Sequence, residues 1–226
     1  HNQGRIWSAA QTEHDIDKRI ETGYLEMNEH LKGGLPKQGL IELQSLPGIG
    51  ELRLMLPYLR NLVAVEQQQG GAPRQIVFIA PPAQLNALMI AEQSLPLEQL
   101  LLIASANTND TLWAAEKCLN SGCCMAVLLW HQLFTVAQVR RLKQAATIGN
   151  AIQIVFRAKQ SVDLSLPVSV SLALSPHRQG LLVEVKKQVG GWPCPAFLVD
   201  MQEAWPSLTQ TPRAQNVIPL SHARVG

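Results

Sequence analysis

The stretch from Leu40 to Arg53 has the order of elements that a phosphate-binding loop requires. A leucine-rich run, Leu40–Leu43, is followed by a turn that contains Gly48 and Gly50 and then by residues of helical period. A loop that binds a nucleoside triphosphate follows the pattern G-x-x-x-x-G-K-[ST], in which the lysine reaches the phosphates and the hydroxyl holds magnesium. The order of elements therefore suits nucleotide binding, and the residue types decide whether it occurs.

The key positions of this loop do not suit phosphate. In an alignment on Gly50, Ser45 replaces the first glycine, Glu51 the lysine and Leu52 the hydroxyl residue. A carboxylate at position 51 would repel the phosphates, and Pro47 lacks a backbone N–H group that could hold them. We therefore interpret the stretch as a tight strand-to-helix turn without a cofactor. The residues of this degenerate loop are Ser45, Gly48, Gly50, Glu51 and Leu52.

Two other predicted strands end without the acidic residue that nucleotide hydrolysis needs. The run 76–80 leads into Pro81 and Pro82, and the run 125–130 leads into His131. An acid at such a strand end normally holds magnesium or orients the attacking water. Because His131 has no acid or nucleophile near it in the sequence, we interpret it as a structural residue. The sequence predicts a protein that is not an enzyme and has no catalytic residue, cofactor or metal.

Short apolar runs alternate with segments of helical period, which is typical of βαβ units and a mostly parallel sheet. Amphipathic spacing predicts a helix over 52–63, with Pro57 in its first turn or at a kink. Asn109 and Thr135 are expected to cap two further helices, which end near Gly122 and Gly149. The predicted strands are 40–43, 76–80, 100–104, 125–130 and 152–156.

The pattern changes after Phe156 to strands without helices. Residues 168–174 and 181–189 predict an antiparallel hairpin, joined by a turn over 175–180, that closes one edge of the sheet. The segment from Trp205 onward has three prolines and no helical period. We expect this tail to be flexible or to become ordered on a partner.

Composition excludes several classes of protein. The 226 residues carry a formal charge of +2, so no overall basic field attracts nucleic acid or an acidic membrane surface. No run of about 18 apolar residues is present that could span a bilayer. The four cysteines lack the paired spacing of a zinc site, and we interpret Cys123 and Cys124 as packing residues rather than a redox pair. We expect a cytoplasmic protein, and we set residues 1–3 aside as vector-derived because the chain begins with His.

Several motifs in the same order resemble the ImuA family, RecA-related proteins of translesion DNA synthesis to which the cell-division inhibitor SulA is a more distant relative. The similar segments cover roughly residues 20–200. The hairpin with Lys186 and Lys187 near its end resembles the last strands of the RecA core, which SulA-like chains do not share, so it favours ImuA over SulA. The similar segments are 47–53, 78–82, 112–116, 121–122 and 180–187.

The resemblance implies an α/β fold of the RecA-like three-layer kind, with a mostly parallel sheet, helices on both faces and an antiparallel C-terminal hairpin. It implies an N-terminal arm over 1–33, a RecA-like core over 34–200 and a flexible tail over 201–226. The function implied is that of a non-catalytic accessory protein in a damage-induced (SOS) mutagenesis complex. Its implied partners are an ImuB-type Y-family polymerase homologue, RecA and an error-prone DNA polymerase.

Weak contact with DNA is a further expectation. RecA-type proteins contact single-stranded DNA through two loops, and the second should follow Phe156. Only Arg157 and Lys159 are basic in the short segment 157–166, which argues against DNA binding through this loop. Another basic group lies on the predicted helix that begins at Thr135, although a solvated helix face also explains such charges. The candidate DNA contacts on this helix are Arg140, Arg141 and Lys143.

Apolar residues near both ends of the chain are candidates for partner contact, because aromatic and branched side chains supply most interface energy. The N-terminal arm could equally pack on its own chain, and Trp192 could cap the sheet. The candidates are Trp7, Trp192, Trp205, Leu208, Ile218 and Leu220.

Two alternative functions stay open at this point. One is a SulA-like inhibitor of cell division that binds the tubulin-like division protein. The other is an ATP-dependent relative of recombinases with an unorthodox site. Co-purification with each partner separates the first from the ImuA-like function, and nucleotide binding tests the second.

Overall fold

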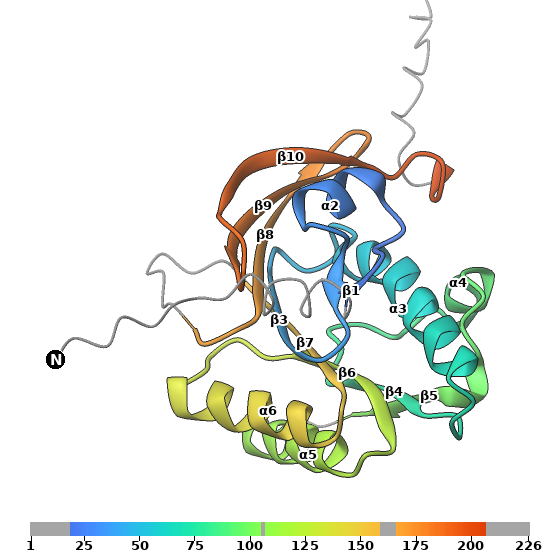
Figure 1. Cartoon of the computed structure of the whole chain (residues 1–226), viewed down its shortest axis with the longest axis vertical. Helices are drawn as coiled ribbons and strands as arrows, with labels where there is room; N and C mark the ends of the chain where they lie inside the picture. Colours follow the sequence, from blue (N-terminus) through green and yellow to red (C-terminus); the bar gives the residue numbers. More distant parts are fainter. Residues whose placement is uncertain (1–18, 105–106, 159–165, 207–226) are drawn as a thin grey trace, which may run out of the picture.

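An eight-stranded sheet runs through the protein in the order β10-β9-β8-β3-β7-β6-β4-β5 (Figure 1). We describe it from a computed structural model that covers residues 19–104, 107–158 and 166–206. The six strands from β8 to β5 are parallel, whereas β8, β9 and β10 pair antiparallel. The strands are β3 (Gly39–Gln44), β4 (Gln75–Ile79), β5 (Leu100–Ile103), β6 (Cys124–Trp130), β7 (Ile152–Arg157), β8 (Val170–His177), β9 (Gly180–Gln188) and β10 (Cys194–Asp200).

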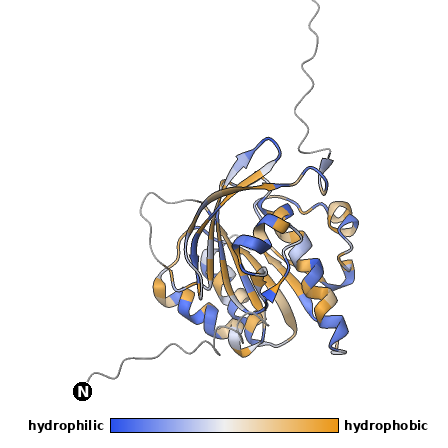
Figure 2. Ribbon diagram, turned by 45° about the horizontal axis from the view of Figure 1, so that its top comes forward, coloured by the Kyte–Doolittle hydropathy of each residue, from blue (hydrophilic) through white to orange (hydrophobic). Residues whose placement is uncertain are grey.

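Helices cover the two faces of this sheet and create two apolar clusters. Helix α3 (Glu51–Gln68) lies on one face, and α5 (Thr108–Asn120) and α6 (Val136–Ile148) lie on the other (Figure 1). Alternate residues of a strand point to opposite faces. Ile41 of β3 accordingly belongs to the cluster that contains Leu59 of α3, and Leu40 to the cluster that contains Leu119 and Leu142. Figure 2 shows the strands as mostly hydrophobic and the helices as amphipathic. The mixed α/β fold with a mostly parallel sheet is therefore confirmed.

Smaller elements complete the described residues. A two-stranded sheet joins β1 (Arg19–Ile20) to β2 (Leu35–Pro36). Helices α2 (Leu25–His30) and α4 (Ala87–Glu92) and the short 3-10 helix η1 (Leu97–Gln99) were not predicted from the sequence. These elements are too short to produce a recognisable period.

Helix α3 confirms the amphipathic pattern and excludes one of the two places expected for Pro57. The helix runs for 18 residues, and Pro57 lies in its interior rather than in its first turn. Gly23 approaches Pro57 so closely that a Cβ atom on Gly23 would lie 2.4 Å from the Cβ atom of Pro57. The proline is therefore used as a flat packing surface for the segment that follows β1.

The caps of α5 and α6 follow local side-chain chemistry. Thr135 caps α6 as expected, and it does so in a capping box with Gln138, whose side chain accepts the Thr135 N–H at 2.8 Å. The expected cap at Asn109 is wrong, because Asn107 is the N-cap and its side chain accepts the Asn109 N–H at 3.0 Å. An asparagine two positions earlier meets the same requirement for an acceptor. Gly149 ends α6 as predicted.

The C-terminal strands correct two expectations. Strands β8 and β9 extend to His177 and from Gly180, so the hairpin turn is two residues long rather than six. Strand β10, which was not predicted, pairs with β9 and takes the edge position that we expected for the hairpin. The register of β10 shifts between Cys194 and Phe197, and this irregularity hides the alternation that marks a strand.

Trp205 belongs to the core rather than to an exposed tail. Its side chain is 5% exposed, and its Nε1–H donates a hydrogen bond of 3.2 Å to the Tyr24 hydroxyl. Burial raises the pKa of Tyr24, against the hydrogen bond from Trp205 and the charge of Arg53. The ring of Trp205 also lies 5.9 Å from the Arg53 guanidinium. The division into arm, core and tail stays a prediction, and Trp7, Leu208, Ile218 and Leu220 lie outside the described residues.

Candidate functional site

The loop between β3 and α3 lies at the carboxyl end of a central parallel strand. Gly48 and Gly50 both have left-handed backbone angles, with φ values of 84° and 113°. Gly50 is the N-cap of α3 and has no side chain of its own that could accept a hydrogen bond from the helix. Glycine tolerates such angles because it has no Cβ atom. The two glycines let the chain turn so that its backbone N–H groups point toward the start of the helix.

The carboxylate of Glu51 occupies the centre of this turn. The Gly48 N–H donates to both carboxylate oxygens, at 3.0 Å for Oε1 and 3.1 Å for Oε2, and the Gly50 N–H donates to Oε2 at 3.1 Å. Glu51 is 5% exposed. Backbone N–H groups at a helix N-terminus are the groups that hold phosphate in a nucleotide-binding loop. Here they hold an acid of the same chain, so the donors are already engaged.

This arrangement adds to the sequence argument about Glu51. The sequence places a carboxylate where a lysine would be needed, and the structure shows that this carboxylate turns back into its own loop. The other loop residues serve the fold. The Ser45 N–H donates to the Arg157 carbonyl at 2.9 Å, and Leu52 packs partly buried against the core cluster. Leu46 stays 66% exposed.

The side chain of His131 fills the turn at the end of β6, which is separated from β3 by β7 in the sheet. His131 is buried, and its Nε2 lies 2.8 Å from the Leu133 carbonyl while its Nδ1 lies 3.5 Å from Thr111 Oγ1. Burial lowers the pKa of His131, which favours the neutral ring. These contacts hold the turn after β6. In the part of the chain that the structure describes, no group of three His, Cys, Asp or Glu residues is placed to hold a metal.

A polar cluster, Glu42 with Gln44, Arg157 and Ser171, lies buried between β3, β7 and β8. Arg157 Nε and Glu42 Oε1 form a buried ion pair, with 2.5 Å between the two atoms. Ser171 Oγ donates to Glu42 Oε2 at 2.5 Å, and Gln44 Nε2 donates to the same oxygen at 3.0 Å. Arg157 is only 3% exposed. Arg157 therefore lies at the end of β7 rather than in the loop expected after Phe156, and Lys159 lies outside the described residues.

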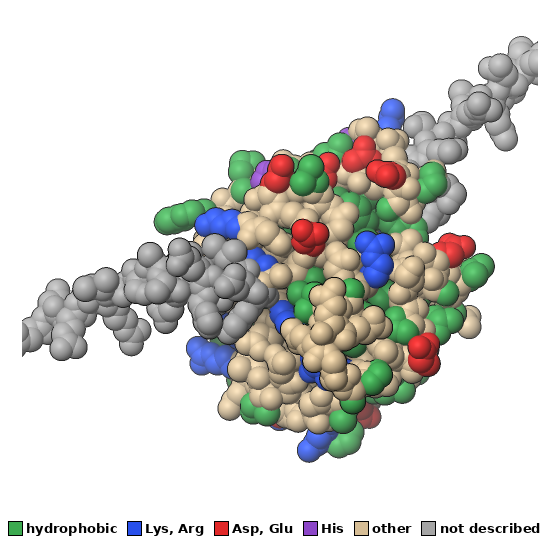
Figure 3. All heavy atoms as spheres, turned by 45° about the vertical axis from the view of Figure 1, so that its right-hand side comes forward, with side chains coloured by type: hydrophobic (Ala, Val, Ile, Leu, Met, Phe, Trp, Pro, Cys, Tyr) green, Lys and Arg blue, Asp and Glu red, His purple; other side chains and the backbone are tan. Residues whose placement is uncertain are grey.

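The basic residues of α6 differ in their exposure and their partners. Arg141 pairs with Glu116 of α5, whereas Arg140 is exposed and Lys143 is half-buried. Lys and Arg side chains are scattered singly over the face shown in Figure 3. DNA contact through Arg140, Arg141 and Lys143 stays a prediction.

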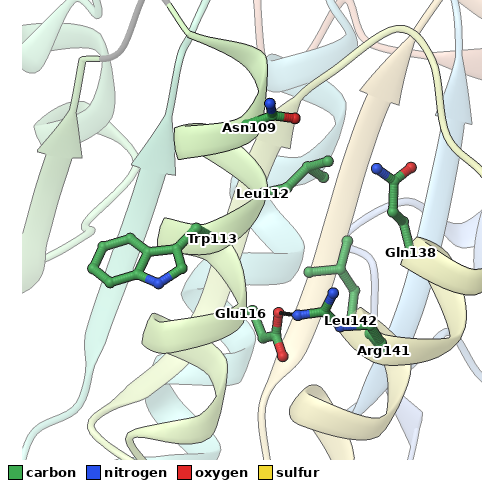
Figure 4. A pocket seen from close by; sticks show the side chains of 7 residues that line it. All are labelled: Asn109, Leu112, Trp113, Glu116, Gln138, Arg141 and Leu142. Atoms are coloured by element: carbon green, nitrogen blue, oxygen red, sulfur yellow. Dashed lines mark hydrogen bonds and ion pairs between the residues drawn. The ribbon is translucent and has the colours of Figure 1, made fainter.

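A pocket between α5 and α6 was not found from the sequence. Figure 4 shows Glu116 and Arg141 facing each other across it, whereas the ring of Trp113 points away from Arg141. Trp113 is 63% exposed, and the Lys117 ammonium group lies 5.9 Å from its ring. The pocket is lined by Asn109, Leu112, Trp113, Glu116, Gln138, Arg141 and Leu142.

Trp192 is the expected partner contact that the structure does place on the surface, with 85% of its side chain exposed. Whether it meets a partner stays a prediction. Among the helices of the described residues, none is both long and apolar enough to cross a bilayer.

Comparisons with known proteins point to one family. The family model of the cell division inhibitor SulA matches residues 43–153, just under half of the chain. The SulA of Serratia proteamaculans is 29% identical over 112 residues, which is 50% of this chain and 62% of that protein. The SulA of Pectobacterium atrosepticum is 30% identical over 112 residues, with coverage of 49% and 62%. The chain thus spans less than two thirds of the length of these relatives.

Two further relatives carry the same name. The SulA of Photorhabdus laumondii is 29% identical over 126 residues, which is 55% of this chain and 67% of that protein. The crystal structure of SulA from Pseudomonas aeruginosa is 27% identical, with a TM-score of 0.43, and the match covers 53% of this chain and 98% of that one.

These matches correct the resemblance to ImuA. The motifs between residues 47 and 122 lie within the span that matches the SulA model. The hairpin that favoured ImuA lies outside that span, and its β-strand pattern identifies no partner. The expected partners ImuB, RecA and an error-prone polymerase are therefore withdrawn, together with translesion synthesis and mutagenesis. What the matches support is a similarity of residues 43–153 to the cell division inhibitor SulA.

Proposed function

We propose that this chain inhibits cell division by binding the tubulin-like division protein. The observation that carries the proposal is the match of the SulA model to residues 43–153. This span runs from β3 into β7, and it contains the Glu51 loop and the pocket between α5 and α6. Relatives that match about half of the chain are named cell division inhibitors.

The closed loop supports inhibition by binding rather than by catalysis. A nucleotide phosphate would have to displace the Glu51 carboxylate from the N–H groups of Gly48 and Gly50, and would then lie beside a like charge. The chain therefore acts without ATP, and the degenerate loop is a remnant of a fold that we infer to be RecA-like. The position of β3 between β7 and β8, followed directly by the loop and α3, supports that classification. The proposed partner implies a cytoplasmic site of action.

The surface that we assign to the division protein is the outer side of α5. Trp113 offers a large exposed aromatic group beside Lys117 and the Glu116–Arg141 pair. Tryptophan and arginine supply a large share of the energy in protein interfaces. An apolar anchor that is surrounded by paired charges suits a protein surface better than a small ligand.

Expression of the chain in dividing bacteria tests the proposal. The unaltered chain should produce long undivided cells and should reduce sedimentation of filaments of the division protein in vitro. Trp113→Ala should weaken both effects by at least tenfold in the dose required. Trp192→Ala is the matched control, because it removes an equally large exposed ring outside the matched residues.

Two outcomes would count against the proposal. Normal division at high levels of the folded chain would reject the function. Equal losses of activity in the Trp113 and Trp192 variants would reject the α5 surface.

A further inference from the structure

Two cysteines of the chain meet at the turn between α5 and β6. Cys118 lies in the last turn of α5, and Cys124 is the first residue of β6. The chain reverses between them through Ser121 and Gly122, which has a left-handed φ of 72°. Cys118 is half-buried and Cys124 is 5% exposed, and both pack in the apolar cluster of α5 and α6. The turn therefore brings together two side chains that follow different elements of the fold.

The Ser121 hydroxyl links the two cysteines across this turn. It donates to the Cys118 carbonyl at 2.7 Å and lies 3.9 Å from the Cys124 Sγ atom. The same hydroxyl accepts the Cys123 N–H at 3.1 Å. Arg74 adds a positive charge, since its guanidinium donates to the Cys124 carbonyl at 3.3 Å. The Cys124 sulfur thus lies beside polar and charged groups, although the residue is buried.

The thiol groups of Cys118 and Cys124 interact with each other. The hydrogen bond between them raises the pKa of Cys118 and lowers the pKa of Cys124 to about 7. The Ser121 hydroxyl and the charge of Arg74 also lower the pKa of Cys124, against the effect of burial. The thiolate is the reactive form of cysteine. Cys124 is therefore the nucleophile of the pair, and Cys118 is the thiol that keeps its proton.

The other two cysteines have different surroundings. Cys123 is exposed, and its Sγ donates to the Ser121 carbonyl at 3.7 Å. Cys194 lies on β10, at the far edge of the sheet from α5 and β6. The sequence directs attention to the adjacent residues Cys123 and Cys124, whereas the structure places the Cys118 thiol beside Cys124.

We propose that Cys118 and Cys124 form a thiol site that a hydroperoxide oxidises to a disulfide. Reactive cysteines of this kind combine a nucleophilic thiolate with a second thiol that resolves the first product. The exposed turn over 121–123 and the half-buried Cys118 place the site next to solvent rather than deep in the core. Both cysteines lie at the end of an element, where the backbone can adjust to the shorter S–S distance. This inference does not depend on the proposed function.

The reaction takes place in two steps. In the first, the Cys124 thiolate attacks one peroxide oxygen, so that an S–O bond forms and the O–O bond breaks. The hydroxide that leaves takes a proton from solvent and becomes water. In the second, the Cys118 sulfur attacks the Cys124 sulfur, an S–S bond forms, and the S–O bond breaks. The departing hydroxide takes the Cys118 proton and becomes a second water. The two sulfurs together lose the two electrons that the peroxide oxygens gain.

The first test maps the oxidised residues in the whole chain. The reduced protein is treated with hydrogen peroxide at neutral pH, free thiols are blocked with N-ethylmaleimide, and the fragments are identified by mass spectrometry. In Cys123→Ser, the fragment that contains Cys118 and Cys124 should lose two hydrogen atoms and take up no label. A dithiol reductant should restore both thiols. Cys194→Ser is the matched control and should form the same disulfide at an unchanged rate.

Two further variants separate the roles of the two thiols. Cys118→Ala should stop at a sulfenic acid on Cys124, which dimedone captures, because the resolving thiol is missing. Cys124→Ala should leave Cys118 reduced, because the nucleophile is missing. Circular dichroism verifies that each variant is folded.

The second test is the pH dependence of the rate of disulfide formation in Cys123→Ser. Because the nucleophile has a pKa of about 7, the rate should rise about tenfold between about pH 6 and pH 8 and then level off. In urea, where the turn is lost, the rate should keep rising toward about pH 9, as for an ordinary thiol with a pKa of about 8.5.

Three outcomes would overturn the proposal. The first is full labelling of Cys118 and Cys124 after Cys123 or Cys194 has been oxidised. The second is oxidation of Cys124 to a sulfinic acid while Cys118 stays free. The third is the same pH dependence in the folded and the unfolded chain, which would show that the fold does not activate Cys124.

Discussion

The loop after β3 and the side of the molecule formed by α5 and β5 use their exposed groups in opposite ways. In the loop, backbone N–H groups that could hold a ligand are directed at Glu51 of the same chain. On the other side, large apolar groups such as Trp113 and Leu102 are left exposed. The loop after β3 has the geometry of a binding site, but its N–H donors are occupied by Glu51. The side formed by α5 and β5 lacks that geometry and keeps large apolar side chains exposed. This contrast supports the proposal that the protein acts through its surfaces.

The largest effect should come from breaking the buried pair Glu42–Arg157 beneath the loop. Glu42→Ala should lower the free energy of unfolding by about 3–5 kcal/mol, because it leaves the Arg157 guanidinium buried without its counter-charge. Urea denaturation measures this loss. The double variant Glu42→Leu with Arg157→Met should regain most of the stability. If the double variant is no more stable than Glu42→Ala, the loss of stability does not come from the unpaired charge of Arg157.

Next in size is the contrast between two tryptophans. Trp205→Ala should cost about 3 kcal/mol, because it removes a buried ring and the hydrogen bond to Tyr24. Trp192→Ala should change stability by less than about 0.5 kcal/mol, since that ring lies in solvent. Thermal unfolding of the two variants compares them directly. Similar melting temperatures would contradict the placement of Trp205 in the core.

A smaller effect should follow from Glu51→Gln, which keeps the shape of the side chain and removes its charge. The loop loses charge-assisted hydrogen bonds from Gly48 and Gly50, at a cost of about 1–2 kcal/mol. Calorimetry with magnesium ATP should still show no binding, because Leu52 supplies no hydroxyl and no lysine is present in the loop. Tight ATP binding by this variant would show that Glu51 alone keeps the loop closed.

The smallest effect is the pH dependence that His131 contributes. Burial lowers its pKa, so below a pH of about 6.5 the unfolded chain binds a proton that the folded chain resists. Stability therefore falls as the pH decreases from about 6.5 to the folded pKa, by at most about 1.4 kcal/mol per pH unit. Comparison with His131→Gln by urea denaturation at pH 7.5 and 5.5 isolates this contribution. A stability difference between the two proteins that is the same at both pH values would contradict it.

Local patterns in the sequence were enough to predict the main elements. Five of the six parallel strands, β3 to β7, and helix α3 follow from apolar spacing, and the start of α6 follows from the capping chemistry of Thr135. These features depend on residues within a few positions of one another, so the sequence alone contains the information.

Features that depend on distant contacts or unusual backbone angles were missed. Glu51 can turn back into its loop only because Gly48 and Gly50 have left-handed backbone angles. The residue types alone do not predict those angles. Trp205 is held by Tyr24, 181 positions earlier in the chain, while the nearby prolines suggested an exposed tail. Strand β10 was hidden by its irregular register at Pro195. The loop's residue types could be judged from the sequence, but the exposed side of α5 and β5 required the tertiary structure.

Calorimetric titration of the full chain with the purified tubulin-like division protein tests the central claim most directly. We predict saturable binding with a dissociation constant of roughly micromolar size, unchanged by magnesium ATP. Binding that appears only when ATP is present would contradict the account of a closed loop. Absence of heat at roughly 100 μM of both proteins, with the chain shown to be folded, would contradict the proposal that this chain acts on cell division by binding that protein.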